Sequence, residues 1–375
     1  MIIISTAVIL IYSTFIIVII WSWKSIKKGS NDISYLEKNT FNISVLIPVR
    51  NEAENIEVLI RSICKVAYHK SQYEVIVIDD HSNDNTGEIA KYLTKEYDQL
   101  KVIDQKKGVS GKKKAIEIGV SNSSGEIIVC TDGDCCVPQN WLAAYAETYR
   151  KSPNTVMVFG GVRYKSNKSF VIDLLNIELS ILQMIGGASM KLGIPTMING
   201  ANLSYIKKAF KAVGAYSGNE NIPSGDDEFL LRKLHSKFPA GVEFLKDRLT
   251  IVETLPPSSF ETWIHQRRRW AAKWKHHKDV YSKLIPVFIF LFNSFSIYMI
   301  FNVLSGNERT VSIIFLGLKS VVEYLLISIS TRFLGVSNKI LNFIYLQLIY
   351  PFYVVFFGIA SNFGKYTWKD REYNN

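Results

Sequence analysis

The alternation of apolar and polar positions divides the chain into an apolar start, a mixed middle and an apolar end. Residues 2–21 carry no charged side chain and are long enough to cross a bilayer. No basic segment precedes this run, and Trp21-Ser22-Trp23-Lys24 follows it where a cleaved signal peptide would have small residues. We therefore expect a transmembrane anchor over residues 1–23 and a polar linker over residues 24–42.

Short apolar runs alternate with helical patterns through the middle of the chain. Residues 53–65, for example, place four apolar side chains on one helical face: Ile56, Leu59, Ile60 and Ile63. The whole pattern predicts strands over residues 43–47, 73–78, 101–104, 126–131 and 156–162, and helices over residues 53–65, 86–96, 112–120 and 141–151. This alternation predicts an α/β fold with a mostly parallel, doubly wound sheet, in which ligands bind beyond the carboxyl ends of the strands.

The apolar segments after the alternating region differ in polarity. Residues 170–190 contain four interrupting polar side chains (Asp173, Asn176, Glu178 and Gln183), which favours a helix packed on the domain or lying at a membrane surface over a span. Residues 196–204 predict a small-residue loop suited to close approach by a ligand. Residues 284–364 contain about three spans, in which Lys319 and Glu323 form a pair that can neutralise itself within a bundle.

The basic residues next to the apolar runs predict an orientation in the membrane. Three lysines directly follow the first run, so the positive-inside bias places the next segment in the cytoplasm of an integral inner- or plasma-membrane protein. Three further spans then place the tail, residues 365–375, outside, although it carries Lys365, Lys369 and Arg371. Either one segment is re-entrant or interfacial, or the tail departs from the rule.

Charge and cysteine content restrict the partners and the compartment. The formal net charge of +11 favours anionic partners, namely phosphate-bearing substrates, anionic lipid or nucleic acid. The four cysteines lack metal-site spacing, and the adjacent pair Cys135-Cys136 has poor geometry for a structural disulfide, so we expect packed, reduced thiols.

Residues 256–283 have the pattern of an amphipathic interface helix. Ser258 and Glu261 follow Pro256-Pro257 with the spacing of a capping box. The helix interleaves aromatic with basic side chains: Phe260, Trp263, Trp270 and Trp274 with Arg267, Arg268, Arg269, Lys273 and Lys275. Beside a membrane span, this composition indicates contact with an anionic leaflet and makes nucleic acid the weaker partner.

Polar clusters follow three of the predicted strands, at residues 48–52, 79–82 and 132–134. Because these strand ends should meet at one edge of the sheet, the clusters are expected to form one site. The spacing of Asp132 and Asp134 sends both carboxylates to the same side, where they repel each other unless a cation lies between them. A hard ion such as Mg²⁺ or Mn²⁺, which usually arrives with phosphates, fits this pair; a solvated Asp-Gly turn is the alternative.

Six short motifs together resemble one protein family. In chain order they are IPVRNE (47–52), DDHSNDNT (79–86), GKKKAI (111–116), DGD (132–134), GDD (225–227) and QRRRW (266–270). This series resembles the family 2 inverting glycosyltransferases, in particular their membrane-embedded branch of polysaccharide synthases and lipid glycosyltransferases. The resemblance covers residues 43 to about 274 and implies a Rossmann-like GT-A catalytic domain over residues 43–255, flanked by transmembrane helices; Glu117 departs from the Asn common in the family.

The resemblance implies roles for individual residues. Donor-binding residues would be Pro48, Arg50, Glu52, Asp79, Asp80, Lys112 and Asp132, although a solvated helix-start lysine is an equal alternative for Lys112. Asp134 would bind Mg²⁺ or Mn²⁺, with Asp132 in support. The catalytic residues would be Asp227 as general base, its pKa raised by burial near Asp226 and Glu228, and Gln266, Arg269 and Trp270, with Arg267 or Arg268 assisting Arg269 at the diphosphate. Acceptor contacts would come from Asn202, Asp226 and Trp270.

The implied activity is transfer of a hexose or N-acetylhexosamine from a UDP-sugar to a lipid-linked or membrane-proximal acceptor at the cytoplasmic face. A processive polysaccharide synthase is the alternative, because the QRRRW motif accompanies both kinds of enzyme. A membrane scaffold that binds nucleotide sugars without turnover is a third interpretation, against which the acidic and arginine motifs argue.

Overall fold

The computed structural model describes residues 1–29, 41–106, 108, 110–220, 222, 225–272, 279–360, 363, 365–368 and 371–374. The chain forms two compact units. The sheet unit comprises Ile26–Lys165 and Met190–Leu255, and the helical unit comprises Met1–Ser25, Ser166–Ser189 and Pro256–Asn375. This division differs from the predicted continuous domain over residues 43–255, because residues 166–189 belong with the apolar helices.

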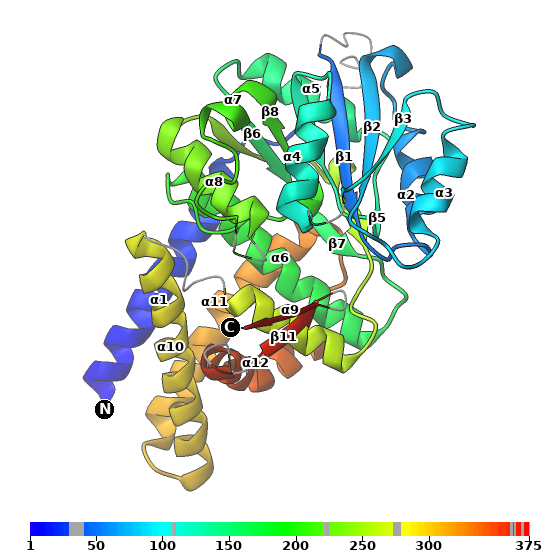
Figure 1. The fold of residues 1–375 in the computed structure, drawn as a ribbon. Coiled ribbons are helices and arrows are strands. Elements are labelled where there is room, and N and C mark those ends of the chain that lie inside the picture. The colour runs from blue at the N-terminus through cyan, green and yellow to red at the C-terminus, as the bar shows by residue number, and fades with distance from the viewer. Residues whose placement is uncertain are drawn as a thin grey trace. The chain divides into compact units, whose positions relative to one another are not determined.

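The sheet unit is built on a seven-stranded sheet with the order β3-β2-β1-β4-β8-β6-β9 (Figure 1). Its strands are β1 (Ile43–Val49), β2 (Tyr73–Asp79), β3 (Leu100–Asp104), β4 (Ile127–Cys130), β6 (Met157–Gly160), β8 (Leu203–Ile206) and β9 (Val242–Leu245). β1, β2, β3 and β4 are parallel, as are β6 and β9, whereas β8 runs antiparallel to both of its neighbours. The predicted mostly parallel sheet is confirmed, and part of the predicted loop at 196–204 is the start of β8.

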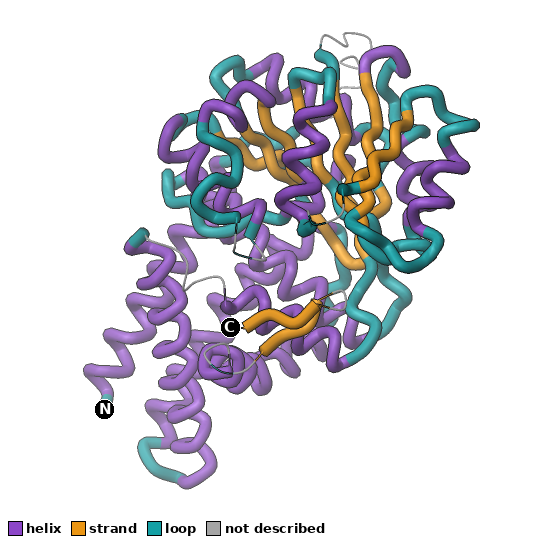
Figure 2. Tube along the Cα trace, in the orientation of Figure 1, coloured by secondary structure: helices purple, strands orange, loops and turns teal. Residues whose placement is uncertain are grey.

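Helices cover both faces of this sheet (Figure 2). They are α2 (Ile56–Ile63), α3 (Thr86–Leu93), α4 (Lys112–Asn122), α5 (Trp141–Lys151), α7 (Lys207–Ala212) and α8 (Asp226–Lys237), and a smaller sheet has the order β5 (Cys135–Cys136), β10 (Val252–Thr254), β7 (Val162–Tyr164). Alternate residues of β1, such as Val45 and Ile47, pack with α2 and α5 in one core. Leu46 points to the other face, where α4 crosses at Gly119; a Cβ there would lie 3.0 Å from the Leu46 and Ile78 side chains.

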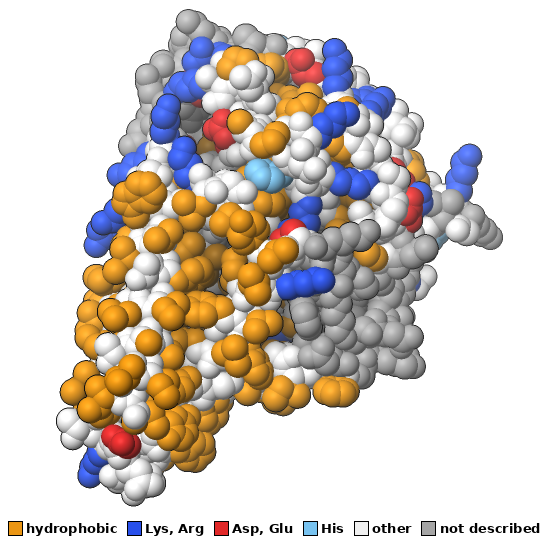
Figure 3. Space-filling view, turned by 90° about the vertical axis from the view of Figure 1, so that its left-hand side faces the viewer, with side chains coloured by type: hydrophobic (Ala, Val, Ile, Leu, Met, Phe, Trp, Pro, Cys, Tyr) orange, Lys and Arg blue, Asp and Glu red, His pale blue; other side chains and the backbone are white. Residues whose placement is uncertain are grey.

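The helical unit contains most of the long apolar segments. Its elements are α1 (Ile2–Ser25), α6 (Phe170–Lys191), α9 (Phe260–Ala272), α10 (Val280–Ser305), α11 (Arg309–Leu334) and α12 (Ile340–Ala360), with a hairpin of β11 (Lys365–Trp368) and β12 (Arg371–Asn374). Five described helices, α1, α6, α10, α11 and α12, are long and apolar enough to cross a membrane. Large side chains such as Ile3, Leu304 and Val321 are exposed on them, and Figure 3 shows a broad hydrophobic surface. A patch of this kind is typical of membrane contact.

Helix α6 is long enough to span but is flanked on both sides by the sheet unit. Lys165 before α6 and Met190, the penultimate residue of α6, both belong to that one compact unit. Of the five candidate spans it is the most buried: 61 % of its apolar stretch is buried, against 17–28 % for the other four. Its Ile177 packs with Ile327 and Phe343 of the helical unit. This arrangement favours the interpretation of α6 as a packed helix over a span.

The start of α9 differs from the predicted capping box. Ser259 and Thr262 form it: the Thr262 amide donates to Ser259 Oγ at 3.1 Å, and the Ser259 amide donates to Thr262 Oγ1 at 2.9 Å. The predicted partner Glu261 has an 85 % exposed side chain instead. The Thr262 hydroxyl, at the third helical position, accepts the N-cap amide, a hydrogen bond that a Glu or Gln side chain makes in the usual capping box. The predicted basic and aromatic positions Lys273, Trp274, Lys275 and Lys369 lie outside the described residues.

Candidate active site

The carboxyl ends of β2, β1 and β4 lie side by side, as predicted, because β1 pairs in parallel with both of the other strands. The loops after β1 and β2 are joined by direct contacts. Arg50 Nη1 donates to the carbonyl oxygen of Asp80 at 3.0 Å, and the Asn51 amide donates to Ser82 Oγ at 3.0 Å. Asn51 and His81 both adopt positive φ, 53° and 57°. Strained non-glycine residues of this kind cluster at ligand sites.

The two carboxylates at the end of β2 are buried and hold the surrounding loops. Asp79 Oδ1 accepts hydrogen bonds from the Ser82 amide at 3.0 Å and the Ser82 hydroxyl at 2.6 Å. Asp80 Oδ2 accepts the amide of Gly111 at 2.9 Å, which connects this loop to the start of α4. The residues predicted to contact the nucleotide base therefore have fixed positions at the rim.

Asp84 and Thr86 support this rim, a role that was not assigned from the sequence. The Glu52 amide donates to Thr86 Oγ1 at 2.8 Å, and the Ala53 amide donates to Asp84 Oδ2 at 3.0 Å. Thr86 in turn donates to the Asp84 carboxylate through its amide and its hydroxyl. Burial alone would raise the pKa of Asp84, but these hydrogen bonds outweigh it and lower the pKa. The spacing Asp-x-Thr before a helix, typical of an Asx turn with a cap, was the available sequence signal.

Lys112 lies between two acidic motifs. Its Nζ is 2.7 Å from Asp132 Oδ1 and 3.3 Å from Asp226 Oδ2, and its side chain is 19 % exposed. Burial would lower the pKa of the Lys112 ammonium, but the charges of Asp132, Asp226 and Asp227 raise it well above its usual value. Lys112 is thus held by ion pairs and is not a solvated helix-start lysine. It brings the DGD and GDD motifs into one site.

Asp227 lies in the first turn of α8, after Gly225, whose φ is 81°. A Cβ at Gly225 would lie 2.8 Å from the Phe229 ring, so only glycine fits this turn. Asp227 Oδ2 accepts the Gly200 amide at 3.1 Å, and Oδ1 accepts the Glu228 amide at 2.8 Å. The predicted base therefore faces the turn at residues 199–202.

Two further basic residues position this segment. Lys113 Nζ donates to the carbonyl oxygens of Asn219 at 2.7 Å and Ile222 at 2.8 Å, which fixes the backbone at these two residues. Arg232 on α8 donates to the carbonyl oxygens of Pro195 and Thr196 at 2.9 and 3.0 Å. Both are positioning residues that the sequence motifs did not distinguish from solvated charges.

Asn202 has surroundings that favour a structural role over the predicted acceptor contact. It is fully buried. Its Oδ1 accepts the Trp141 indole N–H at 2.8 Å and the Tyr145 hydroxyl at 2.5 Å, and its Nδ2 donates to the carbonyl oxygens of Gly161 and Thr250. An amide with both its oxygen and its nitrogen engaged inside the core has no capacity left for a substrate.

Asp132 and Asp134 supply the donor set expected for a hard divalent ion. Gly133 between them allows close packing, because a Cβ there would lie 2.8 Å from Glu52 Cγ. Among the described residues, no group of three or more His, Cys, Asp and Glu side chains is arranged to hold a metal ion. Two carboxylates fit Mg²⁺ or Mn²⁺ if phosphate oxygens and water complete the coordination, as is usual for Mg²⁺.

The QRRRW motif lies on α9 in the helical unit. Arg267 is buried, with its Nη2 2.7 Å from Glu178 Oε2 and its guanidinium 4.4 Å from the centre of the Trp270 ring. Arg268 Nη2 donates to the carbonyl oxygen of Phe363 at 3.1 Å. These partners argue against Arg267 and Arg268 as the predicted assistants at the diphosphate, and one face of Trp270 is covered by Arg267. Arg269 and Gln266, both half-buried, remain predicted site residues.

Together these features define a class of protein. The sheet is mostly parallel, and acidic loops and an Asp-x-Asp pair follow the carboxyl ends of its strands. This is the architecture of a GT-A nucleotide-sugar transferase. The chain carries a glycosyl transferase family 2 domain, matched over residues 44–214. The family resemblance inferred from the six motifs and the predicted GT-A fold are both confirmed.

Relatives and a solved structure agree with this assignment. The chain is 28 % identical over 274 residues to the poly-beta-1,6-N-acetyl-D-glucosamine synthase of Staphylococcus aureus, covering 71 % of this chain and 63 % of the relative. It is 42 % identical over 100 residues to the glycosyltransferase AglE of Haloferax volcanii, covering 27 % of this chain and 33 % of that protein. The chain therefore spans less than two thirds of these relatives' lengths.

The fold is shared with a mannosyltransferase, PcManGT from Pyrobaculum calidifontis, solved in complex with GDP-Man and Mn²⁺. The TM-score is 0.57 at 14 % identity, with 96 % of each chain covered. At this identity the likeness supports the GT-A architecture alone.

Proposed function

We propose that the protein is an inverting, membrane-bound glycosyltransferase that moves a hexose or N-acetylhexosamine from a UDP-sugar to a lipid-linked or membrane-proximal acceptor. One observation carries the proposal: the Lys112 ammonium lies within ion-pair distance of both Asp132 and Asp226. The DGD and GDD motifs, to which we assign the donor phosphates and the base, therefore lie next to each other in the sheet unit. The family 2 domain and the rim of β1, β2 and β4 support the same conclusion.

The donor would lie along this rim. Asp79 and Asp80 would accept the imide N–H of uracil, and Arg50, Glu52 and Pro48 would border the ribose and base. Guanine also presents N–H donors to a carboxylate, so GDP-sugars are the rival donors. UDP is proposed because of the family resemblance. An assay with a panel of UDP- and GDP-sugars distinguishes the two kinds of donor.

The chemistry is a single displacement at the anomeric carbon. Asp227 would accept the proton of the attacking hydroxyl, with its carboxylate oriented by the amides of Gly200 and Glu228. Lys112 would neutralise charge on the departing diphosphate, and the family resemblance suggests the same role for Arg269. Mg²⁺ or Mn²⁺, held by Asp134 with support from Asp132, would stabilise the leaving nucleoside diphosphate when bound.

The helical unit and the charges beside it support single addition at the cytoplasmic face. With α6 taken as a packed helix, α1, α10, α11 and α12 remain as described helices that are long and apolar enough to cross. Four helices leave little material for a polymer channel in one protomer, which supports single addition. The basic residues after α1 support a cytoplasmic sheet unit. Processive synthesis is the second candidate, and the similarity to a polysaccharide synthase is the observation that favours it.

The test is transfer by the purified full-length protein in lipid nanodiscs, with radiolabelled UDP-Glc, UDP-Gal, UDP-GlcNAc and GDP-Man and a membrane lipid extract. We expect one UDP-sugar to label a lipid by a single residue; a ladder of products indicates processive synthesis. Asp227→Asn should abolish transfer but bind UDP with metal, whereas Asp134→Ala should also bind UDP poorly. Asp104→Asn, an exposed carboxylate on β3, is the matched control. Wild-type turnover by Asp227→Asn or Asp134→Ala refutes the site assignment, and binding without turnover of any donor indicates a scaffold.

A further inference from the structure

Lys112 forms an ion pair with Asp132, a residue that is also proposed to help bind the metal. Lys112 Nζ is closer to Asp132, one of the two carboxylates of the Asp-x-Asp motif, than to Asp226. Asp132 therefore already has a cationic partner in the protein itself. The inference below rests on the proposed function, because it concerns the order in which that site is filled.

The position of this ammonium is fixed from several sides. The Gly111 amide is held by Asp80 Oδ2 at 2.9 Å, and the Gly111 carbonyl oxygen accepts the Ala115 amide at 3.0 Å in the first turn of α4. Gly200 borders the other end of the side chain, because a Cβ there would lie 3.5 Å from Lys112 Nζ. Lys112 thus lies where α4, β4, α8 and the turn at residues 199–202 meet.

Charge explains why a cation is needed at this junction. Asp132, Asp226 and Asp227 all act on the Lys112 ammonium. Without a positive charge these three carboxylates would repel each other in a partly buried site. A divalent ion held with the help of Asp132 would add further positive charge beside the Lys112 ammonium, and like charges at short range repel. The metal and the ammonium therefore compete for Asp132.

Among the described residues, few further protein ligands are available to a metal ion at this site. No group of three or more metal-ligating side chains is present among these residues. Phosphate oxygens are the additional ligands that a donor brings, and a diphosphate also offers the Lys112 ammonium a new anionic partner. Arrival of the diphosphate thus adds ligands for the metal and removes its competitor.

We propose that Lys112 is a positioning residue that occupies Asp132 until the donor diphosphate arrives, so that metal binding depends on the donor. With the diphosphate present, the ammonium exchanges the carboxylates for phosphate, and Asp132 becomes available to the metal. The same exchange releases Asp226 beside the base. Lys112 then couples filling of the donor site to the acidic segment that holds Asp227.

The experiment measures Mn²⁺ binding to the full-length protein in detergent, by the electron paramagnetic resonance signal of free Mn²⁺, with and without UDP. In the wild type, UDP should strengthen Mn²⁺ binding by about tenfold or more. In Lys112→Met, Mn²⁺ alone should bind more tightly than to the wild type, UDP should strengthen it less, and UDP itself should bind more weakly. Lys112→Arg should keep the dependence on UDP. Lys114→Met, which removes a more exposed lysine paired with Glu117 on the same helix, is the matched control and should behave as wild type.

Unchanged or weaker Mn²⁺ binding by Lys112→Met overturns the proposal. If that variant does not fold, the wild type decides, because equal Mn²⁺ affinity with and without UDP also overturns it. Neither measurement requires transfer. Donor-dependent Mn²⁺ binding without transfer of any sugar therefore contradicts the proposed function alone, and transfer with Lys112-independent Mn²⁺ binding contradicts this inference alone.

Discussion

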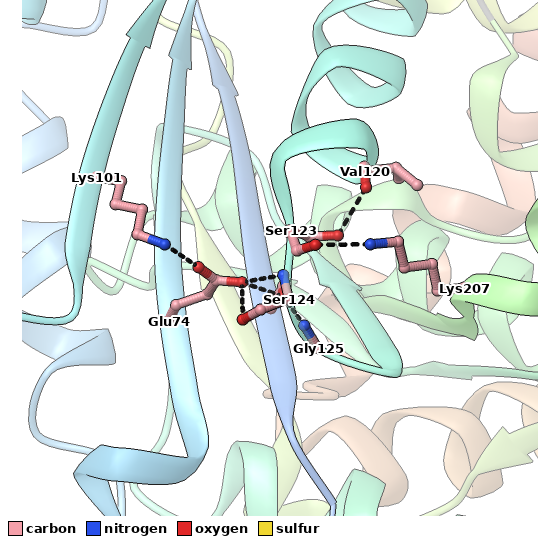
Figure 4. Close-up of polar contacts among 8 residues, drawn as sticks. Glu74, Lys101, Val120, Ser123, Ser124, Gly125 and Lys207 are labelled. Carbon is pink, nitrogen blue, oxygen red and sulfur yellow. Dashed lines mark hydrogen bonds and ion pairs between the residues drawn. The ribbon is translucent and has the colours of Figure 1, made fainter.

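Replacement of Glu74 by glutamine should destabilise the sheet unit through a network far from the active-site rim. Figure 4 shows this network at the amino-terminal end of β2. Glu74 Oε1 accepts hydrogen bonds from the Ser44 hydroxyl at 2.7 Å, the Ser124 amide at 2.5 Å and the Ser124 hydroxyl at 2.7 Å. Its Oε2 is 2.7 Å from Lys101 Nζ. One carboxylate therefore ties β2 to β1, to β3 and to the turn before β4.

The magnitude follows from the pKa of this buried carboxyl. Burial would raise the pKa of Glu74, but the hydrogen bonds from Lys101, Ser124 and Ser44 outweigh it and lower the pKa from 4.5 to about 2. A shift of this size corresponds to ~3 kcal/mol of folding free energy at neutral pH. Because the folded-state pKa is below the unfolded one, this contribution is complete above pH 4.5 and is lost as the pH falls toward 2. Glu74→Gln should cost ~2–3 kcal/mol, since the amide oxygen keeps part of the network.

The assay is thermal unfolding of the full-length protein in detergent, followed by intrinsic fluorescence from pH 7 down to pH 3. At pH 7 the midpoint of Glu74→Gln should fall by several degrees, at roughly 2–4 °C per kcal/mol. The difference from wild type should shrink as the pH falls. Asp104→Asn breaks an ion pair with Lys91 in which both side chains are more than half exposed, so it should cost less than about 0.5 kcal/mol. An unchanged midpoint for Glu74→Gln, or a deficit that does not depend on pH, refutes the reasoning.

Two further variants test buried polar groups. Asn202→Leu should cost ~2–4 kcal/mol, because it leaves the Trp141 indole N–H and a buried hydroxyl without an acceptor; Tyr149→Phe, which removes one hydrogen bond, should shift the thermal midpoint much less. An equal shift in the two variants contradicts the structural role of Asn202. Glu178→Gln should cost ~3–5 kcal/mol by leaving Arg267 buried without its charged partner, and adding Arg267→Met should restore part of the midpoint. A double variant whose losses simply add would show that the pair is not coupled.

Local patterns determined the elements and their faces. The short apolar runs of β1 and β2 and the helical patterns of α2 and α5 predicted these elements, because each pattern reflects which side chains of a segment are buried together. The rim could also be predicted, since parallel strands joined by helices place their carboxyl ends at one edge. Six motifs in order then indicated the family, which the match over residues 44–214 confirms.

Contacts between segments far apart in the sequence decided the rest. The predicted loop at residues 196–204 includes the first two residues of β8, because so short a segment forms a strand only where β4 and β6 provide partners on both sides. Three adjacent arginines are equivalent in the sequence, yet packing pairs Arg267 with Glu178 and directs Arg268 to a backbone carbonyl.

Asn202 and Lys112 show the physical reason most directly. Both are polar residues, and both were predicted from the sequence to be site residues. The fold buried the amide of Asn202 among Trp141 and its neighbours, and it placed the ammonium of Lys112 between two carboxylates. A residue's type determines which interactions it can make, but its partner is determined by the segments that the fold brings next to it.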